Sequence, residues 1–167
     1  EPGAWIQWDV ITEGPKASSL VRADEGAFLR AYLVGADEQI FVCDGKPQQN
    51  RANSPESVKF CVRRTEGENL DSVFTTVFEP GTDDPFIEAI TRIETDVSGL
   101  VLLKVSLNSG QTHYIFNAPE AAECTIEDGI EFSGRVGVLS LNPSGDVDGA
   151  YLYDAERMAL GDWEVTS

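Results

Sequence analysis

The stretch SVKFCVRRTEGENLDSVFTTVFEPGTDDPFIEAITRIE, residues 57–94, decides the fold class. It contains three runs rich in alternating apolar residues, at 57–65, 72–79 and 85–94, and turn signals of glycine, proline and acidic residues separate them. Alternation with a period of two places every second side chain on one face, which is the pattern of a half-buried β-strand. The stretch therefore predicts three strands joined by turns.

The last of these runs, PFIEAITRIE (85–94), fits two structures. Its apolar side chains follow a helical spacing, with Asp84 as an N-cap and Pro85 at the first helical position. The same segment also alternates from Ile87 to Ile93, as a strand does. We predict a strand, because the segments on both sides are strand-like.

Short strand patterns of the same kind continue on both sides of this stretch. They lie at 4–11, 18–23, 27–34 and 39–43 upstream, and at 100–107, 111–118, 123–128, 129–134, 135–142, 149–154 and 161–167 downstream. The polar loop 46–56 is the longest irregular segment, and AERMAL (155–160) is predicted to form a helical turn. About thirteen short strands without a long helical period predict an all-β fold, an antiparallel β-sandwich of two packed sheets.

Length and composition limit the class of protein. The chain has 167 residues, of which 41% are hydrophobic, and its 29 acids and 12 bases give a formal charge of −17. We predict a single domain over residues 1–167. The acidity argues against nucleic-acid binding, and no apolar run approaches the roughly 20 residues of a membrane helix. Because the chain opens at Glu1-Pro2-Gly3 without a leader, we expect an excised piece of a larger protein.

The charge is unevenly distributed along the chain. Residues 117–167 carry eleven acids and two bases, whereas residues 46–64 carry five bases and one acid. Four of these bases are candidate contacts to an anionic glycan, with arginine offering bidentate hydrogen bonds: Lys46, Arg51, Lys59 and Arg63. The alternative is a solvent-exposed face whose cations pair with local acids such as Glu66 or Glu68.

Three aromatic residues provide a second means of binding sugars. Tyr151 and Tyr153 share one face of their predicted strand, about 6–7 Å apart by the rise of a strand, and could stack a sugar chain. Trp5 lies on the more exposed face of the strand at 4–11. The alternative is that these aromatic side chains fill the core or cover sheet edges.

One segment, GDVDGAYLYD (145–154), suggests a metal site. It places Asp146, Asp148 and Asp154 near a glycine, and Ca²⁺ is bound by several oxygen ligands. The spacing is not that of the helical calcium loop. We therefore name these three residues as ligands of a structural calcium ion, with an acidic turn as the alternative.

The sequence contains no self-sufficient catalytic motif, and we predict no catalytic residue. His113 and Tyr114 are adjacent, so on a strand they point to opposite faces and cannot easily serve one substrate atom. No pair of acids is distinguished for glycoside hydrolysis, which needs two carboxylates facing each other across a sugar.

The three cysteines, Cys43, Cys61 and Cys124, are odd in number. We predict buried free thiols, because cysteine behaves as a small hydrophobic residue. A disulfide between Cys43 and Cys61, which lie in neighbouring predicted strands, is the alternative.

The stretch quoted first resembles the C-terminal β-sandwich region of heparinase II/III-like polysaccharide lyases. The resemblance is carried by Arg63-Arg64, the turn Gly67-Glu68-Asn69-Leu70, the run from Ser72 to Pro80, and Pro85-Phe86-Ile87. The upstream order of WDV, FLRAYLV and IFVCDGKP is also similar, so the resemblance extends over roughly two thirds of the chain.

This resemblance implies an accessory domain of a larger enzyme. Such lyases join an (α/α) toroid of catalytic helices to β-sheet domains and cleave uronic-acid polysaccharides by β-elimination. We expect a non-catalytic domain that binds an acidic polysaccharide, uronic or sulfated, beside a catalytic domain in a secreted or periplasmic protein. The alternatives are a purely structural β-domain that exposes an apolar patch where the toroid packs, or part of a lyase active site.

Overall fold

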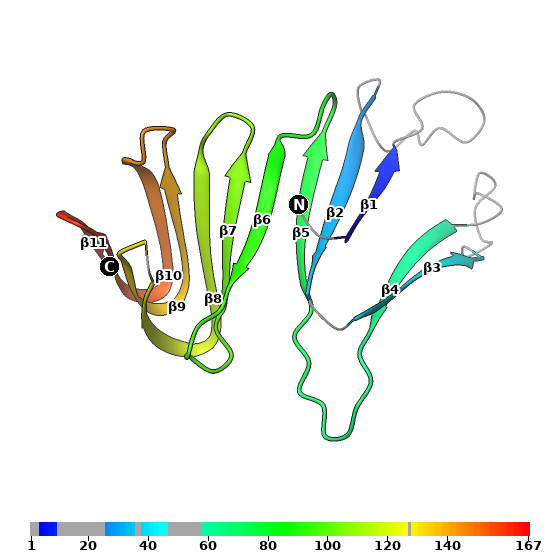
Figure 1. Cartoon of the computed structure of the whole chain (residues 1–167), viewed down its shortest axis with the longest axis horizontal. Helices are drawn as coiled ribbons and strands as arrows, with labels where there is room; N and C mark the ends of the chain where they lie inside the picture. The colour runs from blue at the N-terminus through cyan, green and yellow to red at the C-terminus, as the bar shows by residue number, and fades with distance from the viewer. Residues whose placement is uncertain (1–3, 10–25, 36–37, 47–57, 127) are drawn as a thin grey trace. The chain divides into compact units, whose positions relative to one another are not determined.

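A computed structural model of the chain describes residues 4–9, 26–35, 38–46, 58–126 and 128–167 (Figure 1). These residues form eleven strands, every pairing between them is antiparallel, and none of them is helical. The all-β antiparallel fold is therefore confirmed. Within the described residues there is also no helix that could cross a membrane.

The chain forms two compact units. The N-terminal unit spans Gly3–Asp84 and the C-terminal unit spans Pro85–Ser167. The N-terminal unit contains a three-stranded sheet in the order β1-β2-β5 and a separate hairpin, β3-β4. Their bounds are β1 (Ala4–Asp9), β2 (Phe28–Val34), β3 (Gln39–Gly45), β4 (Val58–Arg64) and β5 (Thr75–Gly81). The predicted strand at 18–23 lies outside the described residues.

The C-terminal unit is a single sheet of six strands in the order β11-β10-β9-β8-β7-β6, a meander in which sequence neighbours pair (Figure 1). The strands are β6 (Ile87–Ile93), β7 (Val101–Leu107), β8 (Thr112–Thr125), β9 (Ile130–Leu141), β10 (Val147–Leu160) and β11 (Trp163–Thr166). The strand interpretation of residues 85–94 is confirmed by β6. Two predicted pairs of short strands are each one long strand, β8 and β9.

The helical turn predicted for residues 155–160 is wrong, because these residues continue β10. A register shift interrupts the pairing of β10 with β9 between Ala155 and Arg157. The bulge resets the alternation, so that Ala155 and Met158 both belong to the core cluster although they are three residues apart. An apolar spacing of three is what a helix shows, and here a bulge produces it.

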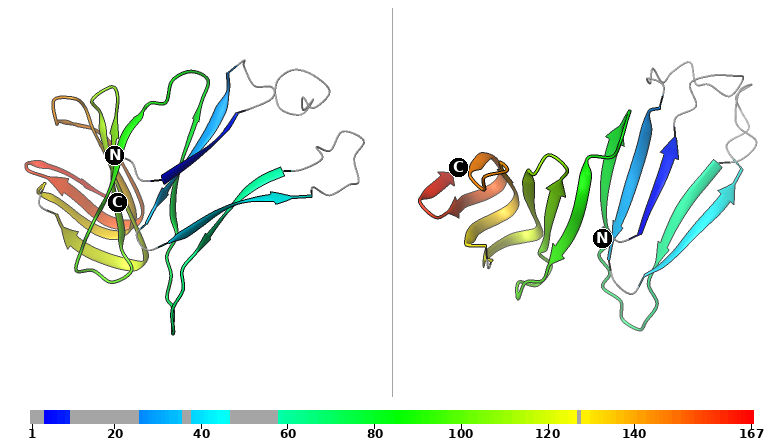
Figure 2. Two further views of the ribbon diagram at one scale, coloured as in Figure 1. Left: turned by 45° about the vertical axis from the view of Figure 1, so that its right-hand side comes forward. Right: turned by 45° about the horizontal axis from the view of Figure 1, so that its top comes forward.

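The long strands bend at one level of the sheet, where Ala122, Gly134 and Ala155 pair across β8, β9 and β10. Figure 2 shows these strands curving. Phe132 precedes the bend in β9, whereas Phe116 of β8 pairs with Gly137, which follows the bend. The two phenylalanine rings stack, with centroids 4.6 Å apart. The core of the C-terminal unit therefore lies between two halves of one bent sheet.

Candidate functional site

The C-terminal sheet has a second face, opposite its core, and two tyrosines lie on it. Leu152 packs against the core cluster, so its neighbours Tyr151 and Tyr153 point the other way, since side chains alternate along a strand. The two tyrosines are 58% and 61% exposed. The prediction that they share one face of a strand is thus confirmed, and both rings are open to solvent.

The pairing of the strands places an apolar row beside each tyrosine. Tyr151 pairs with Val138 of β9, which pairs with Ile115 of β8. Tyr153 pairs with Val136, which is half-buried. We call Tyr151, Tyr153, Val136 and Val138 the tyrosine platform. The Cα atoms of the two tyrosines are about 6–7 Å apart along the strand.

Polar groups lie around this platform. Asn117 pairs with Val136 across β8 and β9 and is exposed. His113 Nδ1 lies 2.7 Å from Ser140 Oγ, on the same face as the platform. Asp148, the extra residue of the bulge before Gly149, is exposed and accepts one long hydrogen bond, of 3.5 Å, from Gln111 Nε2. An aromatic surface with adjacent amide and carboxylate groups can meet both the apolar face and the hydroxyls of a sugar.

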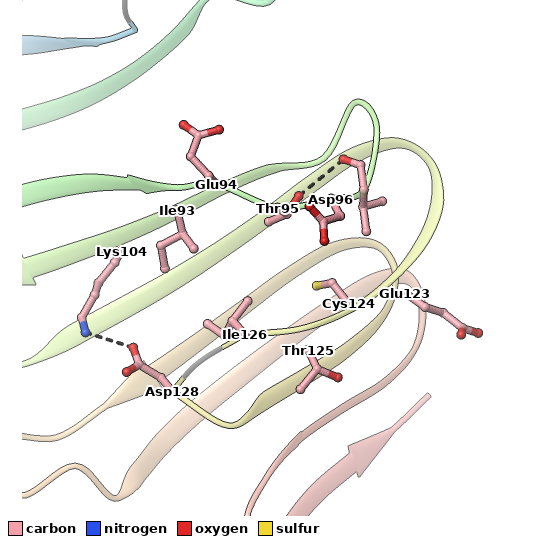
Figure 3. Close-up of a pocket in the computed structure, with 11 residues that line it drawn as sticks. Ile93, Glu94, Thr95, Asp96, Lys104, Glu123, Cys124, Thr125, Ile126 and Asp128 are labelled. Atoms are coloured by element: carbon pink, nitrogen blue, oxygen red, sulfur yellow. Dashed lines mark hydrogen bonds and ion pairs between the residues drawn. The ribbon is translucent and has the colours of Figure 1, made fainter.

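A hollow of about 740 Å³ opens elsewhere in the C-terminal unit, within the range of small-molecule sites. Figure 3 shows Ile93, Cys124 and Ile126 pointing into it, while Glu94 and Glu123 point away. Its lining is formed by Ile93, Glu94, Thr95, Asp96, Val97, Lys104, Glu123, Cys124, Thr125, Ile126 and Asp128. An apolar floor with an ion pair at one end is suited to holding a small polar molecule.

The ion pair in the hollow joins β7 to the turn before β9. Lys104 Nζ lies 3.1 Å from Asp128 Oδ2, and the buried Tyr114 hydroxyl donates to the same oxygen. Hydrogen bonds from Tyr114 and Lys104 lower the pKa of Asp128, hydrogen bonds with Tyr114 and Asp128 raise the pKa of Lys104, and burial raises the pKa of Tyr114. At neutral pH the lysine and the carboxylate are charged and the phenol is neutral.

The thiol of the hollow is not activated. Burial raises the pKa of Cys124, so the thiol stays protonated at neutral pH, whereas the thiolate is the nucleophile. A general base needs a pKa close to the working pH, and Asp128 is shifted away from it. The hollow is therefore better suited to binding than to proton transfer or nucleophilic attack.

The predicted basic residues lie in the N-terminal unit, and acids of that unit bind two of them. Arg63 makes a bidentate contact with Glu38, Nε to Oε2 at 2.5 Å and Nη2 to Oε1 at 2.6 Å, and the two side chains are 9% and 7% exposed. Lys59 Nζ lies 2.6 Å from Asp44 Oδ1 at the surface. Lys46 is exposed, and Arg51 lies outside the described residues.

Arg63 is enclosed more completely than its ion pair requires. Its Nη1 donates to the backbone oxygen of Thr75 at 2.5 Å and to Thr76 Oγ1 at 2.8 Å. The guanidinium thus ties the hairpin β3-β4 to β5 and offers no free edge to a ligand. The alternative considered for this segment, cations paired with local acids, describes Arg63 and Lys59, and also Arg64, which pairs with Glu66.

Trp5 also lies in the N-terminal unit and is 49% exposed. The guanidinium carbon of Arg30 is 4.1 Å from the centroid of its ring, and Gln7 Oε1 accepts hydrogen bonds from Arg30 Nε and Nη2 at 3.1 and 2.6 Å. One face of the indole is therefore covered by a cation that is held in place. Trp5 and the basic residues belong to one unit and the tyrosine platform to the other.

The three aspartates proposed as calcium ligands do not converge. Asp146 accepts from Asn142 inside the loop, and Asp148 accepts from Gln111. Asp154 pairs with Arg135 six residues further along β10, which is roughly 20 Å at the rise of a strand. Among the described residues no group of three metal-binding side chains is found. The extended strand between the aspartates separates residues that are close in sequence.

The free thiols predicted for the cysteines are confirmed, and all three side chains are half-buried. Cys43 pairs with Phe60 and Cys61 pairs with Val42 in the β3-β4 hairpin. The two cysteines are thus one position out of register, and their side chains point to opposite faces of the hairpin. This register prevents the alternative disulfide.

Several residues of these sites could not be recognised from the sequence. Val136, Val138 and Asn117 join the tyrosine platform through strand pairing, and Lys104 and Asp128 meet across 24 residues. The only signal in the sequence was the alternation at 149–154, which predicts that the tyrosines share a face. Pairing partners of that strand carry no comparable local signal.

Comparison of the chain with protein-family models, with curated proteins and with solved structures finds no match. The resemblance to heparinase II/III-like lyases thus rests on the residues quoted for it.

Proposed function

We propose that this protein is a non-catalytic carbohydrate-binding module and that Tyr151 and Tyr153 stack against the sugar rings of a polysaccharide. The observation that carries the proposal is the exposure of both rings, 58% and 61%, side by side on one face of a regular sheet. Tyrosine supplies a large, rigid contact area at a low cost in conformational entropy. The platform therefore binds without first having to be ordered.

The setting of this module comes from the resemblance. A strand that ends in paired basic residues, followed by the turn Gly67–Leu70 and the run Ser72–Pro80, supports a place beside the catalytic toroid of a secreted or periplasmic polysaccharide lyase. In that setting the module holds the polysaccharide near the catalytic domain. Linked binding raises the effective concentration of substrate at the enzyme without any new contact to the reacting bond.

The test is affinity electrophoresis of the full chain in gels that contain single polysaccharides, acidic and neutral. We expect retardation by at least one polysaccharide. The variant carrying Tyr151→Ala and Tyr153→Ala should bind about tenfold more weakly or worse, as expected for the loss of stacking anchors worth about 1.4 kcal/mol or more together. The matched control is Phe78→Ala, which removes another exposed aromatic ring, 60% exposed, from the N-terminal unit.

Two results would contradict this proposal. One is that no polysaccharide of the panel retards the chain. The other is that the tyrosine variant and the Phe78→Ala variant bind as tightly as each other.

A second candidate function is a structural one, packing against a neighbouring domain. It is favoured by the hairpin β3-β4, whose apolar side chains are exposed on both faces: Ile40, Phe41, Val42, Val58, Phe60 and Val62. An isolated two-stranded hairpin is at best marginally stable in water, and contiguous exposed apolar surface marks an interaction site. The domain that packs there, on this proposal, is the catalytic toroid that the resemblance implies.

A further inference from the structure

The charge of the C-terminal unit limits which polysaccharide the tyrosine platform can accept. Residues 85–167 contain fourteen acidic and four basic side chains. Three of the four bases are held by acids of the same unit: Lys104 by Asp128, Arg135 by Asp154, and Arg157 by Glu131 and Glu164. The acidic side chains of the unit outnumber the basic ones, and most of the basic ones already pair with acids. The unit therefore repels an approaching polyanion.

Two aspartates lie near the tyrosines along β10, and one of them, Asp154, is paired with Arg135 at 3.1 Å. Asp154 follows Tyr153 directly and its side chain is 60% exposed, and Asp148 lies in the bulge two residues before Ala150. Asp154 is adjacent to Tyr153, and Asp148 is three residues from Tyr151, roughly 10 Å at the rise of a strand, which is close to the Debye length of roughly 8 Å at physiological salt. Asp148 and the net negative charge of the unit therefore repel a bound anion, and salt screens this repulsion only in part.

The remaining base of the unit is too distant to compensate. Arg92 of β6 is exposed and pairs with Leu103 of β7. A row of paired residues runs from Tyr151 across β9, β8 and β7 to Arg92. Arg92 is therefore four strand spacings, or about 19 Å, from Tyr151. That distance exceeds the Debye length about twofold, so Arg92 does not neutralise an anion held between the two tyrosines.

We infer that the tyrosine platform selects an uncharged polysaccharide and rejects uronic-acid and sulfated ones. The inference rests on the proposed function and replaces the acidic glycan that the sequence suggested. Carboxylates accept hydrogen bonds from sugar hydroxyls, and such charge-assisted bonds are strong. Asp148 and Asp154 and the amide of Asn117 therefore favour the hydroxyls of a neutral sugar, and the same carboxylates repel a uronate or sulfate group.

The experiment uses the full chain in gels that contain one polymer each: a mixed-linkage β-glucan, a galactomannan and a xylan as neutral probes, polygalacturonate as the uronic probe and heparin as the sulfated probe. We expect retardation by a neutral probe only, at least about tenfold stronger than by either anionic probe, a difference of about 1.4 kcal/mol. It should change little between 20 mM and 500 mM salt, because no ion pair forms on binding.

The variant with Asp148→Asn and Asp154→Asn tests the cause. The two substitutions remove negative charge, so retardation by polygalacturonate at low salt should increase, while binding of the neutral probe should weaken, because neutral hydrogen bonds replace charge-assisted ones. Asp162→Asn, an exposed acid of the β10–β11 turn, is the matched control and should leave both unchanged.

The outcomes separate the two proposals. Retardation by polygalacturonate or heparin but by no neutral probe, abolished by the tyrosine variant, overturns the selectivity and leaves the carbohydrate-binding function standing. Retardation by no probe at all overturns the carbohydrate-binding function, and the selectivity with it.

Discussion

Asp128 is the residue on which the hollow of the C-terminal unit depends. It accepts from the buried Tyr114 hydroxyl and pairs with Lys104 across β7 and the turn before β9. These two donors lower its pKa. Since the carboxyl group of an unfolded chain titrates near pH 4, the folded state binds this proton less tightly, and the ionised carboxylate stabilises the fold above that pH. The stabilisation is lost as the pH falls from about 4 through the lowered pKa.

We predict that Asp128→Asn lowers the free energy of unfolding by about 1 kcal/mol at pH 7, a modest value because the side chain is 48% exposed. Urea unfolding at pH 7 and at pH 3 measures the effect, and the difference between the two proteins should be smaller at pH 3, below the pKa of the unfolded carboxyl group. Asp162→Asn controls for the relief of charge repulsion in this acidic chain. An equal loss at both pH values would show that the charge of Asp128 is not the source.

At the scale of the element, β9 decides the shape of the C-terminal sheet. Gly134 has a φ of +146°, and a Cβ added there would lie 2.1 Å from the Cβ of Ala155 on the neighbouring strand. A Cβ at Gly137 would lie 2.6 Å from both the Phe132 ring and the Met158 methyl group. The first glycine lets the strand bend, and the second leaves room for the side chains that the bend brings inward.

Gly134→Ala should therefore destabilise the chain by about 3 kcal/mol or more, from backbone strain together with a clash against a neighbouring strand. The matched control is Gly149→Ala, in a part of β10 where an added Cβ meets nothing within 4 Å and the expected change is within about 0.5 kcal/mol. Thermal or urea unfolding compares the two. Similar small losses for both variants would mean that the bend does not depend on Gly134.

At the scale of the whole molecule, the two units differ in surface chemistry. The exposed apolar side chains of the β3-β4 hairpin and eight of the twelve bases belong to the N-terminal unit. The C-terminal unit contains a closed core and a strongly acidic surface with two exposed tyrosines. On our proposals, domain packing belongs to the first unit and sugar binding to the second.

The division predicts that the native chain binds the apolar dye ANS through its N-terminal unit. The variant with Phe41→Ser and Phe60→Ser removes two rings that are 43% and 44% exposed on one face of the hairpin, and it should lower ANS fluorescence at least about twofold without changing binding to polysaccharide. The variant with Tyr151→Ala and Tyr153→Ala should weaken binding to polysaccharide and leave ANS fluorescence unchanged. ANS fluorescence that is weak in the wild type, or unchanged in the serine variant, would contradict the packing role.

The residue pattern by itself determined the fold class, the position of most strands and the shared face of Tyr151 and Tyr153. It could do so because alternation and turn residues act over a few neighbouring positions. The same local rule separated His113 from Tyr114, which the structure places on opposite faces of β8. The helical turn predicted for residues 155–160 was wrong, because the bulge in β10 gives the same apolar spacing of three residues as a helix.

Only the tertiary structure decided which residues meet. Glu38 encloses Arg63 from 25 residues away, Asp128 reaches Lys104 across 24, and the C-terminal sheet bends over its own core. Strand register and bending set these partners, and neither is encoded in the spacing of residues along one strand. The surface available for a ligand follows from that pairing, as the residues that join Tyr151 and Tyr153 in the platform show.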